Sequence, residues 1–454
     1  MSPTELKGKR FTVVGGARSG LAVSRLLVRA GAKVFLTDKA PASPGIEAAL
    51  DEIGVTYEFG GHTPRALEAD YFAVSPGVPS RANLILQASR SGIPVFSEIE
   101  ISSWFCKAPI VAITGANGKT TTTSLTGHLF SASGRNTFVA GNIGFPFADY
   151  VLDTTPDDVV VLEVSSFQLD HVDTFRPRVS LLLNITPDHL DRYENNFELY
   201  ARSKARIFEN QREGDVLVYN QDDPVVLERL EVASGREGPR KLGFSQEREL
   251  DEGAFVRGDS IFIRLDGRKE YLMKADELSL RGKHNLYNAL AAVLAGRVLG
   301  VSLESLRSSL TNFKGVPHRL EFIREIDGVR YINDSKATNV NAVWYALESF
   351  KEHVVLIAGG RDKGNDYSPL IPFVKDRVRA VVAIGESADK VVRELGPAAP
   401  ATVVARSMEE AISEARRFAK PGDVVLLSPA CASFDMFDNY EHRGDTFRRL
   451  VEAL

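Results

Sequence analysis

Short apolar runs and helix-like segments alternate along the whole chain. Near its start, an apolar run at residues 10–14 is followed by a glycine-rich turn, a helix-like segment at 21–29 and a second apolar run at 33–37. This order predicts strand, helix and parallel strand, the βαβ unit of a dinucleotide-binding fold. A further strand is expected at residues 71–75, and Pro-containing punctuation near residue 107 marks a domain boundary.

The alternation continues in the middle of the chain. Strands are expected at residues 110–113, 159–164 and 179–183, with few hairpin signals between them. This arrangement favours a mostly parallel sheet covered by helices. Residues 250–275 instead contain Gly-Asp and Asp-Gly turns, which predict short antiparallel strands at an edge of that sheet.

The last third of the chain repeats the plan of the first. Two helices, at residues 284–299 and 303–313, precede a Lys-Gly-Val-Pro boundary. The apolar runs after it are separated by helical segments and lie at residues 354–358, 381–384 and 424–427. They predict a second doubly wound α/β domain.

Together these patterns predict an α/β protein with three domains. Residues 1–107 would form a Rossmann-like domain, residues 108–313 a central domain with the mostly parallel sheet of P-loop ATPases, and residues 314–454 a C-terminal Rossmann-like domain. Ligands in such sheets bind at the carboxyl ends of the strands, so we look for chemistry there.

Composition excludes several classes of partner. The 60 acidic and 55 basic side chains leave no large basic face for nucleic acid. Cys106 and Cys431 are far apart and have no metal-site spacing, which argues against a disulfide framework or a zinc site. No apolar run approaches the ~20 residues that span a bilayer, and the N-terminus lacks a signal-peptide core, so we expect a cytoplasmic protein without a membrane partner.

The clearest chemistry lies in the segment Pro109–Ser124. An apolar strand ends at Thr114, and the turn and helix start that follow are Gly115, Ala116, Asn117, Gly118, Lys119, Thr120 and Thr121. Glycines let backbone N–H groups surround phosphate oxygens, while the lysine suits the β/γ-phosphates and the threonine hydroxyl suits Mg²⁺. Ile113 stands where the standard pattern has a glycine, so we expect a shortened TGxxGKT loop that binds ATP or GTP.

The turn Gly15–Gly20 allows two interpretations. A glycine turn followed by Asp38 is typical of NAD sites, but Arg18 stands where close approach to a pyrophosphate favours a small residue. A nucleotide-sugar diphosphate facing Arg18 and Ser19 fits at least as well. Ser75-Pro76-Gly77 follows a strand end where such sheets bind ligands, although a plain Pro-Gly turn also explains it.

Three ionisable residues downstream of the phosphate loop are candidates for catalysis. Glu163 ends a buried-type strand, where an ionised carboxylate favours a Mg²⁺ role over a salt bridge. His189 could ligate a metal, act as a base, or form structural hydrogen bonds beside Asp188. Lys204 lies on a cation-rich helix, and its spacing alone predicts only a solvated basic face.

Two further groups flank the last domain boundary. Asn285 and Asn288 precede or lie on the first turn of a helix, where an amide caps the helix or contacts a purine edge. His318 and Arg319 follow Pro317, and a cation beside a hinge suits either a γ-phosphate gate or a surface salt bridge.

Three strand ends in the last domain present groups that hold anions. Lys336 and Thr338 offer a cation and a hydroxyl at a helix N-terminus, and the glycine-rich turn with Lys363 repeats this chemistry. Ser433 and Phe434 stand near a third helix start. Three such ends in one domain favour a small acidic substrate over three unrelated turns.

Several segments together resemble the Mur ligase family of bacterial peptidoglycan synthesis. They are TGANGKTTT, EVSSFQL, NITPDHLDRY, YARSKARIF, GKHNLYNALAA, GVPHRLE, NDSKATN and LSPACASFD. They occur in the family's order and cover all three expected domains. Within the family, the chain is most similar to the ligases that add D-glutamate to UDP-N-acetylmuramoyl-L-alanine.

The resemblance implies an ATP-dependent reaction. ATP phosphorylates the terminal carboxylate of the UDP-sugar substrate, the amine of D-glutamate attacks the acyl phosphate, and the tetrahedral intermediate collapses to an amide and phosphate. It also implies two Mg²⁺ ions, held by Thr120, Glu163, His189 and a carbamylated Lys204. Lys119 and His318 would complete the catalytic set.

The resemblance also assigns the binding residues. Those for adenine and the rest of ATP, besides the phosphate loop, are Asn285, Asn288, Arg319 and Asp334. Those for the UDP-sugar are Arg18, Ser19, Asp38, Ser75, Pro76, Gly77, Asn142 and His189. Those for D-glutamate are Lys336, Thr338, Lys363, Ser433, Phe434 and Tyr440.

Two departures from the family pattern concern the edges of the site. Lys39-Ala40 replaces the Thr-Arg of better-known members, which puts the uracil contacts in question, and Tyr440 replaces a phenylalanine. The alternatives are a ligase with another amino-acid specificity, a folylpolyglutamate synthase-like ligase, a UDP-sugar sensor and an NAD-dependent dehydrogenase. We expect small-molecule partners only and a monomeric protein.

Overall fold

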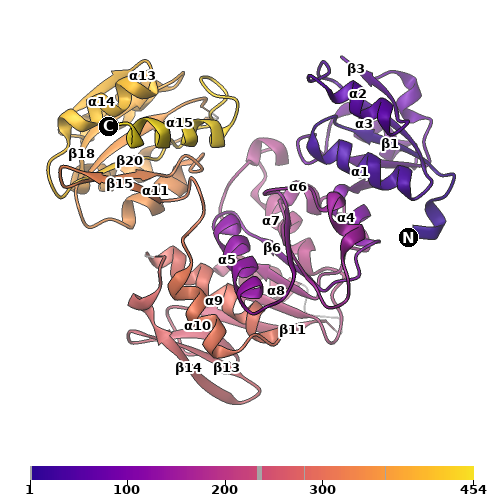
Figure 1. The fold of residues 1–454 in the computed structure, drawn as a ribbon, viewed down its shortest axis with the longest axis horizontal. Helices are drawn as coiled ribbons and strands as arrows, with labels where there is room; N and C mark the ends of the chain where they lie inside the picture. Colours follow the sequence, from indigo (N-terminus) through magenta and orange to yellow (C-terminus); the bar gives the residue numbers. More distant parts are fainter. Residues whose placement is uncertain (1–2, 233–237, 281, 363) are drawn as a thin grey trace. The chain divides into compact units, whose positions relative to one another are not determined.

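The structure, a computed structural model, describes residues 3–232, 238–280, 282–362 and 364–454 (Figure 1). Its internal contacts divide the chain into two units. The first unit comprises Met1–Leu278 with Leu286–Phe313, and the second comprises Ser279–Asn285 with Lys314–Leu454. The first unit contains two sheets and the second contains one.

The N-terminal sheet is parallel throughout, with the strand order β3-β2-β1-β4-β5. Its strands are β1 (Arg10–Val14), β2 (Lys33–Asp38), β3 (Thr56–Phe59), β4 (Tyr71–Val74) and β5 (Val95–Ser97). Its helices are α1 (Arg18–Arg29), α2 (Ile46–Glu52), α3 (Asn83–Arg90) and α4 (Glu98–Ser103). The predicted βαβ start is confirmed, and α1 begins three residues earlier than the apolar pattern indicates.

The central sheet has nine strands in the order β14-β13-β12-β11-β10-β9-β6-β8-β7. The strands are β6 (Ile110–Thr114), β7 (Thr137–Gly141), β8 (Val159–Glu163), β9 (Val179–Leu182), β10 (Val216–Asn220), β11 (Arg240–Ser245), β12 (Gly253–Arg257), β13 (Ser260–Leu265) and β14 (Arg268–Lys274). The helices are α5 (Lys119–Ala132), α6 (Ser166–Leu169), α7 (Phe197–Ala205), α8 (Pro224–Val232), α9 (Lys283–Val298) and α10 (Leu303–Asn312). The antiparallel strands expected at residues 250–275 are confirmed as the β12–β14 edge of this sheet.

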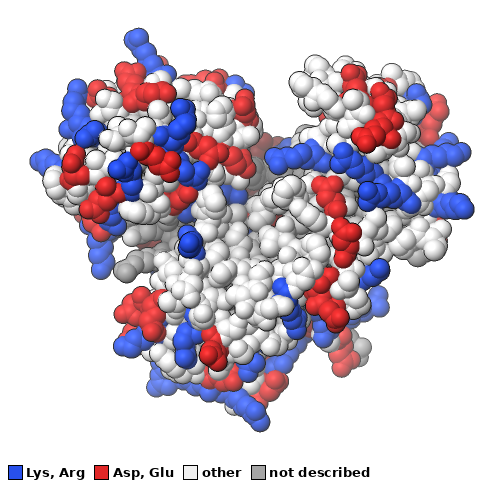
Figure 2. All heavy atoms as spheres, viewed as in Figure 1, with Lys and Arg blue, Asp and Glu red and all other residues white. Residues whose placement is uncertain are grey.

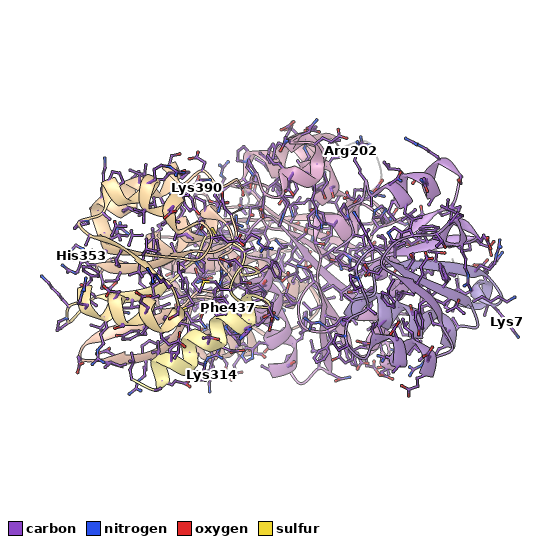
Figure 3. The ribbon with its side chains drawn as sticks, turned by 90° about the horizontal axis from the view of Figure 1, so that it is seen from above. Lys7, Arg202, Lys314, His353, Lys390 and Phe437 are labelled. Carbon is purple, nitrogen blue, oxygen red and sulfur yellow. The ribbon has the colours of Figure 1, made fainter. Side chains whose placement is uncertain are left out.

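The sheet of the second unit has the order β15-β16-β20-β17-β18-β19 and is parallel except for β15. The strands are β15 (Glu321–Ile326), β16 (Val329–Asn333), β17 (Val354–Gly359), β18 (Val378–Ile384), β19 (Thr402–Ala405) and β20 (Val424–Leu427). The helices are α11 (Val340–Glu348), α12 (Ile371–Arg377), α13 (Ala388–Leu395), α14 (Met408–Phe418) and α15 (Tyr440–Glu452). His353 directly precedes β17, and Phe437 follows β20 by ten residues, so Figure 3 shows them at opposite ends of this unit.

Burial explains why the central strands were readable from the sequence. The four apolar residues of β8, Val159–Leu162, are all fully buried, with β6 and β7 paired in parallel on either side. A strand covered on both faces reads as an unbroken apolar run, and β-branched residues fit its pleated surface. Polar residues therefore gather where the strands end.

Two buried carboxylates join the N-terminal sheet to the central one. Glu98 accepts a hydrogen bond from Ala148 N at 2.6 Å, and burial raises its pKa to about 7. Glu100 accepts hydrogen bonds from the backbone N–H groups of the segment 173–175, each within 2.9 Å. Removing a carboxylate from water is costly, so these donors are needed to offset the loss of hydration.

The turn before α5 is packed closely against α9. Gly118 has φ +82°, and a Cβ atom there would lie 2.3 Å from Oδ1 of Asn288. Asn288 also accepts a hydrogen bond from the Thr122 hydroxyl at 3.2 Å. The turn therefore requires glycine both for its backbone conformation and for this contact.

Charges of both signs are interspersed on the face of the molecule shown in Figure 2. None of the helices in the described parts of the chain is long and apolar enough to span a bilayer.

Replacing Glu98 with glutamine tests the buried carboxylate. The pKa of Glu98 is raised from 4.5 to about 7 in the folded protein, so its stabilising proton is fully bound below pH 4.5 and is lost as the pH rises through 7. The amide cannot ionise, so we expect the stability of Glu98→Gln relative to wild type to rise between pH 5 and pH 8, by up to about 3 kcal/mol. Urea unfolding at pH 5 and pH 8 measures the free energy of unfolding of both proteins. An equal change in this free energy for the two proteins between these pH values would contradict the prediction.

Alanine at Gly118 tests the contact with α9. Gly134 is a matched control, because its φ is +86° and a Cβ atom there would have nothing within 4 Å. Both variants carry a left-handed alanine that costs about 1–2 kcal/mol, but only Gly118→Ala adds a steric clash. We expect its unfolding free energy to fall by at least about 1 kcal/mol more than that of Gly134→Ala. Equal losses in denaturant titrations would refute the contact.

Candidate active site

The phosphate-loop residues connect β6 to α5. Gly118 occupies the N-cap position of α5, so no side chain caps this helix N-terminus. Lys119 Nζ donates hydrogen bonds to the carbonyl oxygens of Gly115 and Ala116, both at 2.8 Å. Lys204 Nζ, from helix α7, donates to the same Gly115 oxygen at 2.7 Å. Two lysine amino groups therefore converge on one carbonyl in front of a helix N-terminus, which favours an anionic ligand.

Lys204 is buried, with 2% of its surface exposed. Burial, followed by repulsion from Lys119, holds its pKa well below the usual lysine value, while the carboxylates of Asp188 and Glu163 act in the opposite direction. The spacing-based expectation of a solvated face is therefore wrong for Lys204. It holds for Arg202 on the same helix, which is exposed and lies at the upper edge of the view in Figure 3.

Glu163 ends β8 beside the phosphate loop. Its Oε1 accepts a hydrogen bond from Asn142 Nδ2 at 2.9 Å, and its buried Oε2 has no hydrogen-bond partner among the described residues. An unsatisfied buried carboxylate oxygen is costly, and a hard divalent cation is the ligand that best relieves the cost. Glu163 therefore fits a Mg²⁺ ligand better than the alternative of a salt-bridged glutamate, and the structure brings it together with Asn142.

His189 lies at the end of the loop after β9. It has φ +51°, and its Nε2 is 3.7 Å from Asp188 Oδ2, while its ring meets the edge of Phe167 at 5.3 Å. Within the part of the chain that is described, no three His, Cys, Asp or Glu side chains converge as a ready-made metal site. The Mg²⁺ ligands implied by the resemblance, including Thr120, would thus need non-protein oxygens such as phosphates to complete a coordination shell.

Asn184 is a site residue that sequence reasoning missed. Its side chain accepts a hydrogen bond from Asn117 N at 2.8 Å and donates to Asn117 O at 3.0 Å. Asn184 follows β9, the strand next to β6, so it fixes the phosphate loop from the neighbouring strand end. Its place directly after a predicted strand was the available signal.

The candidate UDP-sugar residues of the N-terminal sheet lie together at its carboxyl edge. Asp38 accepts hydrogen bonds from Gly16 N at 2.6 Å and Ala40 N at 2.8 Å. The Ser75 hydroxyl donates to Gly15 O at 3.2 Å. These bonds hold three strand ends around the turn that carries Arg18, whose side chain is exposed.

Arg192 connects this edge to the central sheet, and sequence reasoning missed it too. Its guanidinium donates to the carbonyl oxygens of Pro76 at 3.1 Å and Gly77 at 2.8 Å, and it lies 4.2 Å from the ring centroid of Phe167. The loop that carries His189 is therefore fastened to the turn after β4. The two segments are over 100 residues apart, so no local pattern indicates the pairing.

Asn285 and Asn288 are both buried, but the contacts assign Asn285 to the second unit and Asn288 to the first. Asn288 adjoins the phosphate loop through Gly118.

In the second unit, Arg319 and Asp334 face each other. Arg319 Nη1 is 3.6 Å from Asp334 Oδ1, and Asp334 also accepts hydrogen bonds from Ser428 Oγ at 2.8 Å and Leu320 N at 3.2 Å. Asp334 is fully buried, and this raises its pKa to about 6. The alternative of a surface salt bridge for Arg319 is therefore wrong, because its partner is inside the protein.

The candidate D-glutamate residues lie at the carboxyl edge of the second unit's sheet. Lys336 Nζ is 3.2 Å from the Tyr440 hydroxyl, which brings the turn after β16 next to the start of α15. Ser433 is buried, whereas Phe434 is 61% exposed and Thr338 is partly exposed. Lys363 lies outside the described residues.

Arg443 organises this edge, although nothing in its spacing marks it. It is 2% exposed and donates to the carbonyl oxygens of Ser335 at 2.8 Å and Cys431 at 3.2 Å. It thereby joins the turns after β16 and β20, which carry Lys336 and Ser433.

Comparison with known proteins covers the whole chain. The descriptions that match are "Mur ligase MurD-like, N-terminal domain" at residues 9–97, "Mur ligase middle domain" at 113–296 and "Mur ligase, glutamate ligase domain" at 318–431. Among solved structures, MurF from Acinetobacter baumannii is similar with a TM-score of 0.61 and 18% identity, covering 100% of this chain and 92% of that one. At this identity the likeness concerns the fold alone.

Curated relatives are much more similar. A protein of Salinibacter ruber described as UDP-N-acetylmuramoylalanine--D-glutamate ligase is 61% identical over 459 residues, which cover 100% of both chains. A protein of Chloroherpeton thalassium with the same description is 48% identical over 469 residues, again covering 100% of both. The chain belongs to the Mur ligase family.

Proposed function

We propose that this protein joins D-glutamate to UDP-N-acetylmuramoyl-L-alanine and converts ATP to ADP and phosphate in doing so. The observation that carries the proposal is the end-to-end similarity, at 61% identity, to a curated protein of that description. The geometry agrees, because it places a phosphate loop with two converging lysines beside a carboxylate that lacks one partner.

ATP is proposed to bind at the turn between β6 and α5. Its β- and γ-phosphates would accept hydrogen bonds from the Gly115–Thr121 backbone and from Lys119, which would leave its two carbonyl partners for the stronger anionic acceptor. Asn288, packed against Gly118, would lie beside the nucleotide, and Asn285, Arg319 and Asp334 would supply further contacts.

Phosphoryl transfer makes the acid reactive. The acceptor carboxylate attacks the γ-phosphorus, ADP leaves, and a C–O–P acyl phosphate forms. The amine of D-glutamate then attacks the acyl carbon, gives up a proton, and the tetrahedral intermediate expels phosphate to leave an amide. Excluding water from the acyl phosphate prevents its hydrolysis, so the surrounding residues must also shield it.

Glu163, Thr120 and His189 are the residues proposed to hold Mg²⁺, with Glu163 Oε2 as the best-supported ligand atom. When bound, Mg²⁺ neutralises phosphate charge as the phosphoryl group is transferred. Asn142 would keep Glu163 Oε1 oriented so that Oε2 faces the metal.

We assign residues 1–107 to the UDP-sugar, residues 108–313 to ATP and residues 314–454 to the amino acid. In residues 1–107, the turn with Arg18 and Ser19 would face the diphosphate, near Asp38 and the turn Ser75–Gly77. In residues 314–454, the residues proposed to bind the carboxylates of D-glutamate are Lys336, Thr338, Lys363, Ser433, Phe434 and Tyr440. Placement in the cytoplasm and a monomeric state are part of the same proposal.

Lys204 is proposed to be carbamylated. An amine reacts with CO₂ only when neutral, and burial beside Lys119 favours the neutral form of Lys204. Its neutral nitrogen would attack CO₂, form an N–C bond and lose a proton, which replaces a buried neutral amine with an anion. That anion would be attracted to the Lys119 ammonium and would add a ligand oxygen for a second Mg²⁺.

The substrate assignment is tested by phosphate release from purified enzyme with ATP, Mg²⁺ and UDP-N-acetylmuramoyl-L-alanine, across a panel of D- and L-amino acids. We expect release with D-glutamate and background rates with L-glutamate and other amino acids. Release driven by a different amino acid would reassign the specificity within the family, and release with none would refute the proposed reaction.

The phosphate-loop assignment is tested by Lys119→Ala. Loss of its charge should lower phosphate release by at least about 10²-fold while UDP-N-acetylmuramoyl-L-alanine still binds, as measured by calorimetry. Retained turnover in this variant would show that the nucleotide binds elsewhere.

Carbamylation is tested by Lys204→Ala, with Arg202→Ala as the control on the exposed face of the same helix. We expect Lys204→Ala to lose phosphate release and to recover part of it with added short-chain carboxylates, which replace the carbamate. Arg202→Ala should retain wild-type activity. In wild-type protein supplied with ¹³C-bicarbonate, a carbamate ¹³C resonance is expected, and its absence at saturating bicarbonate would exclude the modification.

A further inference from the structure

Asn333 ends β16 directly behind His318 and is fully buried. Its Oδ1 accepts a hydrogen bond from Ser335 N at 3.2 Å. Its Nδ2 lies 3.0 Å from His318 Nδ1, 3.1 Å from Glu321 Oε2 and 3.2 Å from Gly444 O.

The orientation of the Asn333 amide follows from these partners. A reversed amide would place its oxygen against the Glu321 carboxylate and the Gly444 carbonyl, and its NH₂ group against the Ser335 N–H. Each of those pairs would bring together two acceptors or two donors. The NH₂ group must therefore face Glu321, Gly444 and His318.

This orientation decides where His318 carries its proton. A hydrogen on Nδ1 would point at the NH₂ group, and the Glu321 carboxylate, the nearest on that side among the described residues, has its Oε2 4.0 Å from Nδ1. Glu321 is already held by Arg448 through two contacts of 2.8 Å and accepts from His318 N at 2.9 Å. The Asn333 NH₂ group has two hydrogens for three neighbouring acceptors, but a protonated Nδ1 would bring two donors together, so Nδ1 is the unprotonated ring nitrogen.

We propose that Asn333 is a positioning residue that holds the His318 imidazole as the neutral tautomer with its proton on Nε2. Gly444 supports the same arrangement, because a Cβ atom there would lie 2.2 Å from His318 Nδ1, so only glycine admits the ring this close. The imidazole is thus held on the β16 side by the Asn333 amide and on the α15 side by the backbone of Gly444.

The charges around His318 come from two elements. Glu321 lies on β15, while Glu441, Asp445 and Arg448 lie on α15, with Asp445 Oδ1 at 3.7 Å from Nε2. Burial outweighs these carboxylates and lowers the pKa of His318, with Arg448 adding to the effect. The ring therefore stays neutral near pH 7, and its Nε2–H is the group left to interact with a ligand.

The consequence for the chemistry rests on the proposed function. His318 adjoins the candidate amino-acid site, since its ring meets the edge of Tyr440 at 6.2 Å and its carbonyl accepts from Lys336 N at 3.0 Å. A neutral imidazole with its proton on Nε2 donates a hydrogen bond to an anionic oxygen there. It cannot take the proton of the attacking amine at that nitrogen, because Nε2 has no free lone pair.

The tautomer can be read without turnover. In protein carrying ¹⁵N-labelled histidine, the His318 signals are identified among the eight histidines by their loss in His318→Gln. We expect Nδ1 to resonate as an unprotonated and Nε2 as a protonated nitrogen at pH 7–8. A proton on Nδ1 in wild type would overturn the inference. A wild-type spectrum as expected in a protein without ligase activity would leave it standing and refute only the proposed function.

Asn333→Asp replaces the donor with an acceptor of the same shape. We expect a proton to appear on Nδ1, the pKa of His318 to rise by about one unit or more, and kcat to fall on the order of 10- to 100-fold with little change in KM for ATP. Asn439→Asp is the control, because this N-cap residue of α15 accepts from His442 N and aspartate caps equally well. Unchanged His318 signals and pKa in Asn333→Asp would refute the positioning role, and the wild-type spectrum decides the matter if that variant does not fold.

Discussion

Two lysine amino groups donate hydrogen bonds to one carbonyl oxygen of the phosphate loop. Lys119 comes from α5, the helix after the phosphate loop, and Lys204 comes from α7, and both donate to Gly115 O. Like charges repel strongly in a buried place, so burial and the neighbouring Lys119 both lower the pKa of Lys204 and favour its neutral form. Glu163, at the end of β8, and Asp188, in the loop after β9, act in the opposite direction. The cation of Lys119 and the helix N-terminus behind it make the site suited to an anion.

Other buried charges hold together segments that the chain order separates. Glu100 accepts hydrogen bonds from backbone N–H groups of residues 173–175. Arg443 donates hydrogen bonds to carbonyl oxygens in the turns after β16 and β20. Asp334 accepts hydrogen bonds from the Ser428 hydroxyl and the Leu320 N–H. In each case one ionised side chain satisfies several polar groups that would otherwise lie unpaired away from water. These contacts position loops, while the apolar strands beneath them supply the bulk of the core.

The sequence was most informative where one physical cause acts locally. Unbroken apolar runs indicated the central strands because both of their faces are covered, and the glycines of the phosphate loop were recognisable because a tight turn requires them. Element ends differed by one to three residues, as for α1. Lys204 was not separable from Arg202 by spacing, since burial depends on what packs against α7. Its importance came from the family resemblance.

Residues that act across long separations were not predictable. Arg192, Asn184 and Arg443 each bond to backbone groups of a distant turn, and no periodicity within their own element marks them. Asn333 could be placed at a strand end, but its partners on β15 and α15 depend on the folded sheet. Such residues can be recognised only in the folded structure, because what marks them is a short distance in space and not a spacing along the sequence.

The Arg192 guanidinium has a mechanical consequence. It donates hydrogen bonds to the carbonyl oxygens of Pro76 and Gly77, and Glu194, two residues later, forms an ion pair with Arg81. The segment that carries His189 is therefore attached at two points to the turn after β4. A displacement of that turn would therefore act directly on the backbone next to His189. Through the side chains of Arg192, Glu194 and Arg81, the turn after β4 is coupled mechanically to the loop after β9.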